Sequence, residues 1–126
     1  DPTQDLNFVI REARLQDTKN RQNSIENDDM ALEDEWANKQ MAVTETSKMA
    51  YNWAIENGIA KEQARAVLPE GIMESRLYVN GTMRSWIHYI DLRSGHGTQK
   101  EHIELARQCA DALEPIFPMI KEFKHV

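Results

Sequence analysis

The chain has 126 residues, of which 40% are apolar, and it carries a formal net charge of −6. This length suits a single domain, and the acidic balance disfavours nucleic acid as a partner, because DNA-binding domains present a basic face. A single cysteine excludes an intrachain disulfide and fits a reducing cytoplasm, and no apolar run has the length of a signal peptide or a membrane span.

Residues 1–30 are expected to form an irregular acidic arm. Residues 1–35 hold ten acids and four bases, whereas acids and bases balance in the rest of the chain. Helical periodicity is weak in the arm, with one short strand expected at Phe8–Ile10, and the polar stretch Lys19–Ser24 is typical of a turn. The acidity therefore belongs to the arm, and the helical body at residues 31–126 is close to neutral.

The stretch Met30–Asn57 has the periodicity of an amphipathic helix. The stripe expected to face the core comprises Trp36, Gln40, Val43, Ser47, Ala50 and Ala54, widened by Met49, Tyr51 and Ile55. Gly58 follows directly and is expected to be a left-handed C-cap, with Ile59 packing behind it.

Two helices and one strand are expected in the middle of the chain. A short helix is expected at Lys61–Leu68, because Pro69 cannot continue it. The best strand candidate in the body is Leu77–Val79, which is rich in residues that favour strands. Thr82 is then expected to cap a helix from Met83 to Leu92.

The last part of the chain contains a break followed by a further helix. The break is expected at Ser94–Gly97, and the helix is expected to begin at Thr98, because Thr98 and Glu101 have the spacing of a capping box. A short helix or two turns should follow Pro115. These elements predict an α+β fold: a helix-rich single domain with a small number of strands.

The region around the third expected helix combines groups that favour an anionic ligand. Arg84 and His88 are four residues apart and therefore share a helix face. Arg93 ends the helix, and the glycine-rich loop after it allows a ligand to approach the main chain. Guanidinium groups donate paired hydrogen bonds to phosphates and carbonyl edges. The pattern predicts a site for a planar, polar, phosphorylated molecule.

Structural roles are the alternative for each of these residues. Arg84 would then be solvated or paired with an acid such as Asp91, and His88 would be a structural histidine. Cys109 is expected to be a small core residue. The separation of His96 and His102 does not match a zinc site, so no metal site is expected.

Four motifs together resemble the family of flavin-dependent thymidylate synthases. They are RLQDTKNRQNS (Arg14–Ser24), ARAVLP (Ala64–Pro69), GTMRSWIHYIDLR (Gly81–Arg93) and GTQKEH (Gly97–His102). Their order is that of the C-terminal portion of phage-type members, so residues 1–126 are expected to be a partial domain of this fold. The family signature, Arg-His-Arg followed seven residues later by Ser, is absent and is expected just upstream of residue 1.

The resemblance implies an activity and roles for particular residues. Family members convert dUMP to dTMP with methylenetetrahydrofolate as the one-carbon donor, reduced FAD as the hydride source and NADPH as a further co-substrate. Arg65 and Arg93 match arginines that bind dUMP, and Arg93 is the catalytic one, because a fixed cation beside the uracil stabilises charge developing on the ring. The FAD contacts implied are Thr82, Arg84, His88 and His96, of which Thr82 replaces an asparagine and His96 is offset by one position.

The resemblance also implies how the protein works as a whole. Family members are homotetramers with shared active sites. Because the chain resembles only the C-terminal portion of such an enzyme and lacks the signature, it is expected to be inactive alone. The expected compartment is the cytoplasm, or the host cytoplasm if a phage encodes the chain. Two other functions remain open: a non-catalytic binding module with the same fold, and a helix-turn-helix DNA-binding regulator built on Tyr51–Gly71.

Overall fold

A computed structural model describes residues 6–95 and 97–125. The chain forms two compact units, and each is built from two separate stretches of sequence. The first unit combines the residues up to Ala13 with Asn27–Leu77, and the second combines Arg14–Glu26 with Tyr78 to the C-terminus. The described residues form four α-helices and one two-stranded sheet, which confirms the helix-rich α+β prediction. The expected boundary near residue 30 remains a prediction.

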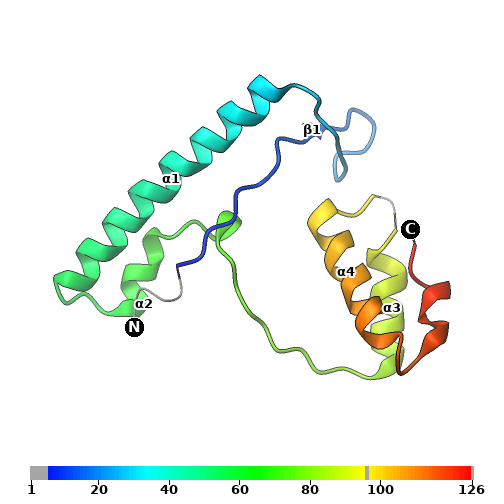
Figure 1. The fold of residues 1–126 in the computed structure, drawn as a ribbon. Coiled ribbons are helices and arrows are strands. Elements are labelled where there is room, and N and C mark those ends of the chain that lie inside the picture. Colours follow the sequence, from blue (N-terminus) through cyan, green and yellow to red (C-terminus); the bar gives the residue numbers. More distant parts are fainter. Residues whose placement is uncertain (1–5, 96, 126) are drawn as a thin grey trace. The chain divides into compact units, whose positions relative to one another are not determined.

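The first unit is built on one long helix, α1 (Met30–Glu56), drawn in cyan to green in Figure 1. The Asp29 side chain caps its start by accepting hydrogen bonds from the main-chain N–H groups of Ala31 and Leu32. At its end, Gly58 has a φ of 76°, and Ile59 donates its N–H to the carbonyl of Ala54 over 2.9 Å. This is the left-handed cap predicted from the sequence. None of the described helices combines the length and apolar character needed to cross a bilayer.

The buried face of α1 is more polar than its sequence indicates. Its buried residues are Gln40, Thr44, Ser47, Tyr51 and Ala54. The predicted stripe is wrong at Trp36, Val43 and Met49, which are all exposed. The physical reason is that the arm contacts this face of α1 through its main chain, which needs polar partners. The carboxamide of Gln40 binds the main chain of Arg11 in this way.

The arm and two short helical segments complete the first unit. Phe8 and Met73 form an isolated antiparallel bridge, which partly confirms the short strand expected at Phe8–Ile10. The expected helix at Lys61–Leu68 is present as α2 (Lys61–Ala64) followed by a 3₁₀ turn, η1 (Arg65–Val67), and a second turn, η2 (Glu70–Ile72), follows Pro69. Tyr51, Ala54, Ala64 and Leu68 form the core of this unit.

The second unit contains the two-stranded sheet. Strands β1 (Leu15–Gln16) and β2 (Ser24–Ile25) pair antiparallel, and the polar stretch between them forms the predicted turn. Arg14 clamps the two strands, because its guanidinium donates to the hydroxyl and the main-chain carbonyl of Ser24 over 2.7 and 2.8 Å.

Two helices lie side by side in the second unit (Figure 1): α3 (Met83–Arg93) and α4 (Lys100–Leu113). Their core contains Ile90, Ala110 and Ile120, and Ile120 comes from a closing 3₁₀ segment, η3 (Pro118–Glu122). The Thr82 hydroxyl accepts from the N–H of Ser85 over 3.2 Å, which confirms the predicted cap of α3.

Two local predictions are wrong. The helix expected to begin at Thr98 begins at Lys100, and its N-cap is Gln99, which makes no side-chain cap hydrogen bond. The strand expected at Leu77–Val79 is absent, and its three side chains are 80%, 91% and 68% exposed. A segment with high strand propensity forms a strand only when another strand pairs with it. No described segment pairs with these residues.

Candidate functional site

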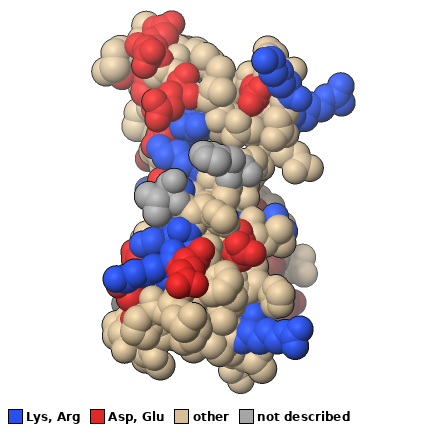
Figure 2. All heavy atoms as spheres, turned by 90° about the vertical axis from the view of Figure 1, so that its right-hand side faces the viewer, with Lys and Arg blue, Asp and Glu red and all other residues tan. Residues whose placement is uncertain are grey.

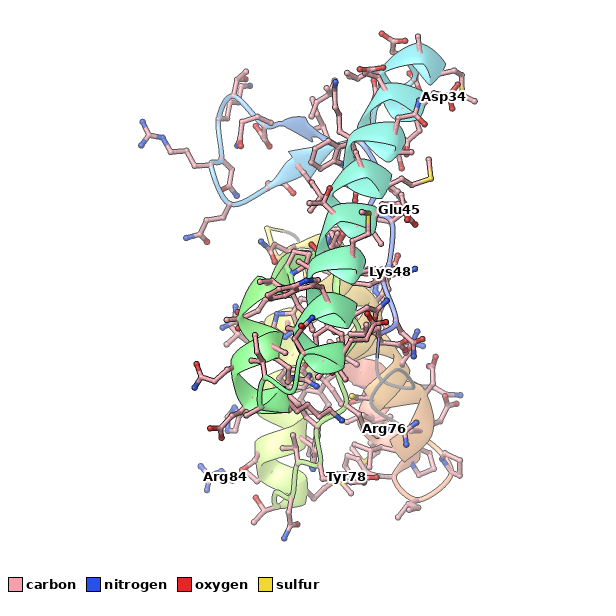
Figure 3. All side chains as sticks on the ribbon, turned by 90° about the vertical axis from the view of Figure 1, so that its left-hand side faces the viewer. Asp34, Glu45, Lys48, Arg76, Tyr78 and Arg84 are labelled. Atoms are coloured by element: carbon pink, nitrogen blue, oxygen red, sulfur yellow. The ribbon has the colours of Figure 1, made fainter. Side chains whose placement is uncertain are left out.

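The solvent side of α3 presents Arg84 and His88, one turn apart as predicted. Ile90 anchors the opposite side of the helix in the core, so both polar side chains remain exposed. Figure 3 shows Arg84 projecting away from the helix. Neither side chain forms a hydrogen bond or an ion pair with the described residues, so their donors are available to a ligand.

Thr82 lies at the start of the same helix, but its oxygen already has a structural task. It accepts the cap hydrogen bond from Ser85, and its hydroxyl lies 3.1 Å from the Ser85 hydroxyl. A ligand at this end of α3 would therefore meet the Arg84 guanidinium as a free donor and Thr82 mainly as a helix cap.

Arg93 is the last residue of α3 and is also exposed. It follows Arg84 by nine positions, and about 100° of rotation per residue brings it roughly half a turn around the axis. Within one copy of the chain, Arg93 therefore lies on the flank of α3 opposite to the flank of Arg84 and His88. The nine-residue spacing predicts that Arg84 and Arg93 lie on opposite flanks, whereas the resemblance of the motif to a known family does not indicate this.

The Arg93 flank carries an aromatic cluster that the sequence did not reveal. Tyr89, one turn before Arg93, has its hydroxyl 3.0 Å from Nε2 of His102 on α4, and Trp86 meets the Tyr89 ring edge-on with centroids 5.8 Å apart. Burial raises the pKa of Tyr89 and the nearby Cys109 thiol adds to this, while the Arg93 guanidinium acts in the opposite direction. Thirteen positions separate Tyr89 from His102, so no local motif indicates the pair.

Cys109 is half-buried against the core of the second unit, as predicted for a small packing residue. Burial raises the pKa of its thiol, which lowers the thiolate fraction at neutral pH. The side chain therefore has the properties of a packing residue, and a reactive nucleophile would require the opposite shift.

The glycine loop between α3 and α4 contacts other parts of its own unit. Gly97 has a φ of 88°, and a Cβ placed there would lie 3.4 Å from the side-chain nitrogen of Asn20 in the β1–β2 turn. A Cβ on Gly95 would meet the ring of His125 at 3.7 Å. His96 lies outside the described residues. A Cβ at either position would make ordinary van der Waals contact, so the feature that favours glycine here is the left-handed φ of Gly97.

Asp91, the acid considered as a partner for Arg84, binds a different residue. Its carboxylate lies 2.9 Å from Nε2 of His125. The main-chain N–H of His125 donates to the buried hydroxyl of Ser94 over 3.0 Å, so the C-terminal segment is attached to the end of α3 at two points. These contacts leave Arg84 without the intrahelical ion pair that would make it purely structural.

Arg65 belongs to the first unit, where it begins η1 directly after α2 and has an exposed side chain. A site shared between Arg65 and the α3 arginines therefore remains a prediction. Figure 2 shows that lysine and arginine side chains lie near acidic side chains in each part of the face that it draws. Among the described residues, no group of three or more His, Cys, Asp or Glu side chains has an arrangement suited to a metal ion.

Comparison with known proteins gives a consistent result over almost the whole chain. The sequence model of the thymidylate synthase complementing protein family matches residues 2–119. A probable flavin-dependent thymidylate synthase of Paramecium bursaria Chlorella virus 1 is 47% identical over 112 residues, which cover 86% of this chain and 50% of that protein. A flavin-dependent thymidylate synthase of Synechocystis is 44% identical over 114 residues, covering 90% of this chain and 52% of that protein.

A more distant relative has the same coverage. The flavin-dependent thymidylate synthase of Kosmotoga olearia is 30% identical over 115 residues, or 91% of this chain and 50% of that protein. The chain thus spans about half the length of the curated relatives it matches. The matched region includes all four motifs and the whole of α3, and the chain belongs to the thymidylate synthase complementing protein family, which is the family of the flavin-dependent thymidylate synthases.

Proposed function

We propose that this chain supplies one half of a flavin-dependent thymidylate synthase that converts dUMP to dTMP. The observation that carries the proposal is the exposed donor set of α3, in a chain whose family match covers this helix. In the overall reaction the C5 hydrogen of dUMP is replaced by a methyl group. Its carbon comes from methylenetetrahydrofolate, which leaves as tetrahydrofolate.

The donors on one flank of α3 fit an FAD molecule. Arg84 offers a guanidinium, which pairs well with the diphosphate, and His88 offers an imidazole one turn away. We also propose Thr82, which caps the start of the helix, and His96, which lies outside the described residues, as FAD contacts. When bound, reduced FAD supplies the hydride that completes the methyl group, and NADPH restores the reduced form.

Arg93 and Arg65 are the residues we assign to dUMP. Beside the uracil, the Arg93 guanidinium would stabilise negative charge that develops on the ring, which makes Arg93 the catalytic residue of this half. Arg65, exposed at the start of η1, would bind the same nucleotide.

We propose a homotetramer with shared active sites, as in the family, and the positions on α3 favour a site that draws on more than one copy. A helix with its side chains is about 10 Å across, so Arg84 and Arg93 on opposite flanks address different ligand surfaces within one copy. A site that needs both arginines is then most simply completed by a second copy. We place the assembly in the cytoplasm of the cell, or of the host of a phage, in line with the single, reduced Cys109.

The two alternative functions have less support. A helix-turn-helix regulator needs a recognition helix that enters the major groove, and α2 is only four residues long. A non-catalytic binding module would keep the ligand contacts but would show no turnover, and an activity assay decides between this alternative and the enzyme.

The test is a chimera in which this chain replaces the matched half of the Chlorella virus relative. We expect dTMP to form from dUMP, methylenetetrahydrofolate, NADPH and FAD. Arg93→Lys should lower kcat/KM for dUMP at least about a hundredfold, because lysine keeps the charge but loses the planar fork. Arg76→Lys, which changes an exposed arginine outside α3, is the matched control and should stay within about twofold. A folded chimera that binds FAD and makes no dTMP would instead identify a binding module.

A further inference from the structure

The last turn of α3 is held by a segment from much later in the chain. The red segment that follows η3 runs back to the end of α3 (Figure 1). His125 makes three polar contacts: its Nε2 lies 2.9 Å from the carboxylate of Asp91, its N–H donates to the Ser94 hydroxyl over 3.0 Å, and its carbonyl accepts from Nε of Arg107 over 2.8 Å. We call Asp91, Ser94, Arg107 and His125 the clasp.

Ser94 lies at the centre of the clasp and is only 1% exposed. Its hydroxyl donates to the main-chain carbonyl of Ile90, and its own carbonyl accepts from a terminal nitrogen of Arg107 over 3.5 Å. The last carbonyls of a helix have no partners within the helix, so they need donors from elsewhere. The clasp supplies such donors from α4 and from the segment after η3, and it therefore fixes the main chain at the end of α3.

Arg93 lies within the turn that the clasp holds. Asp91 precedes it by two positions, and Ser94 follows it directly. Two positions on a helix correspond to about 200° of rotation, so the contact between Asp91 and His125 lies on the far side of α3 from Arg93. The clasp thus holds the main chain of this turn while the Arg93 side chain stays exposed to a ligand.

The family match ends at residue 119, before the segment that carries His125, so the match assigns this residue no role. We propose that His125, acting through the clasp, is a positioning residue for Arg93. It holds the last turn of α3 so that the guanidinium meets the nucleotide in one orientation. Misplacement of a reacting group by about 1 Å can cost a hundredfold in rate, so even modest loosening should be measurable. The kinetic part of this inference rests on the proposed function, whereas the structural part does not.

The structural part is tested by amide hydrogen exchange on the full chain alone. Asp91 and His125 have side chains that are 55% and 51% exposed, so substitution to alanine should leave the fold intact, and circular dichroism checks this. In His125→Ala, exchange at the amides of Arg93 and Ser94 should speed up about threefold, because the turn opens more often. Asp91→Ala should have the same effect, and the double variant should exceed neither single variant, because both remove one contact.

The kinetic part is tested in the chimera with the Chlorella virus relative, with rates expressed per bound FAD. His125→Ala should lower kcat about fivefold and leave KM for dUMP within about twofold. In an Arg93→Lys background it should have less than about a 1.5-fold effect, because lysine has no planar fork to orient. His125→Gln should retain activity within about twofold, since its amide nitrogen can replace Nε2 as a donor to Asp91. Lys121→Ala, which removes an ion pair with Glu114, is the control in both tests and should change neither exchange nor kcat.

Two results would overturn the proposal. The first is unchanged exchange at Arg93 and Ser94 in His125→Ala, because the clasp would then not hold the turn. The second is an equal loss of kcat in the Arg93 and Arg93→Lys backgrounds, because His125 would then act on general stability. A chimera without any turnover would contradict the proposed function and the kinetic part together, and the exchange measurement would still decide whether the clasp fixes the end of α3.

Discussion

The carboxamide of Gln40 holds the arm against α1 by binding both main-chain groups of one residue. Its oxygen accepts from the N–H of Arg11 over 2.8 Å, and its nitrogen donates to the carbonyl of Arg11 over 2.9 Å. The side chain thus repeats the pairing that a neighbouring strand would offer. The sequence predicts that Gln40 lies on the inward stripe of the helix, but its partner lies 29 positions away and no local pattern indicates it.

Replacing Gln40 with leucine tests this role. Gln40→Leu removes both hydrogen bonds to the main chain of Arg11, and we expect a loss of about 2 kcal/mol in the free energy of unfolding. Urea denaturation followed by circular dichroism measures the change. Gln108→Leu, at an exposed position of α4, is the control and should shift the free energy by less than about 0.5 kcal/mol. Equal effects of the two substitutions would show that the Arg11 contact does not matter for stability.

Asp17 organises the β1–β2 turn as an ionised carboxylate. The side-chain amide of Asn23 donates to it over 2.9 Å, and the N–H groups of Lys19 and Asn20 also donate. These hydrogen bonds, with Asn23 first, lower the pKa of Asp17 below its usual value. A lowered pKa means that the stabilising contribution is present above the unfolded value and disappears as the pH falls through the folded one.

The corresponding prediction concerns the titration of Asp17. We expect its carboxyl carbon, followed by NMR, to titrate below the usual aspartate pKa of about 3.9, and Asn23→Ala to bring the pKa back towards that value. Gln22→Ala, one position earlier, removes a side chain that has no bond to this carboxylate and should leave the titration unchanged. An unaltered pKa in Asn23→Ala would exclude the amide as the main cause.

At the scale of elements, the sequence correctly predicts those helices, caps and turns that depend on signals from neighbouring residues. The helices at 30–56 and 83–93, their caps at Gly58 and Thr82, and the turn between β1 and β2 all depend on residues within a few positions of each other. The expectation at Leu77–Val79 fails because a strand needs a partner, and partner choice is not local. The predicted start at Thr98 fails by two residues, within a loop that packs against Asn20 and His125.

Gly58 provides a test of one of these local signals. Its φ of 76° favours glycine, and a Cβ added there would meet no atom within 4 Å, so Gly58→Ala isolates the backbone cost. We expect a loss of about 1 kcal/mol in the free energy of unfolding. Gly71→Ala is the matched control, since that position is equally open but has no left-handed φ; it should be neutral or slightly stabilising. Thermal or urea denaturation of the two variants gives the comparison, and a neutral Gly58→Ala would contradict the assigned cap.

At the scale of the whole molecule, the candidate site is only partly predictable. The spacing of Arg84 and His88 gives their shared exposed face correctly, because helical geometry is regular. The Tyr89–His102 contact could not be predicted, since it depends on how α3 and α4 pack. Arg65 and Arg93 belong to different units, and a site that they share stays a prediction.

We expect the chain alone to form no dTMP when supplied with dUMP, methylenetetrahydrofolate, NADPH and FAD. The physical reason is that it spans about half the length of its relatives, while Arg84 and Arg93 lie on opposite flanks of one helix. Liquid chromatography of the reaction mixture measures the product, with the active chimera as the positive control. Detectable turnover by the unassisted chain would contradict both the expected inactivity and the need for further protein groups.

Each unit is built from two separate stretches of sequence, and this arrangement has a consequence for limited proteolysis. The β1–β2 hairpin precedes α1 in sequence but belongs to the unit of α3 and α4. A nick within the open connection at Ser75–Gly81 therefore gives an N-terminal fragment that still carries the hairpin of the other unit. The two fragments should stay together on a sizing column after cleavage and separate only when denaturant is added.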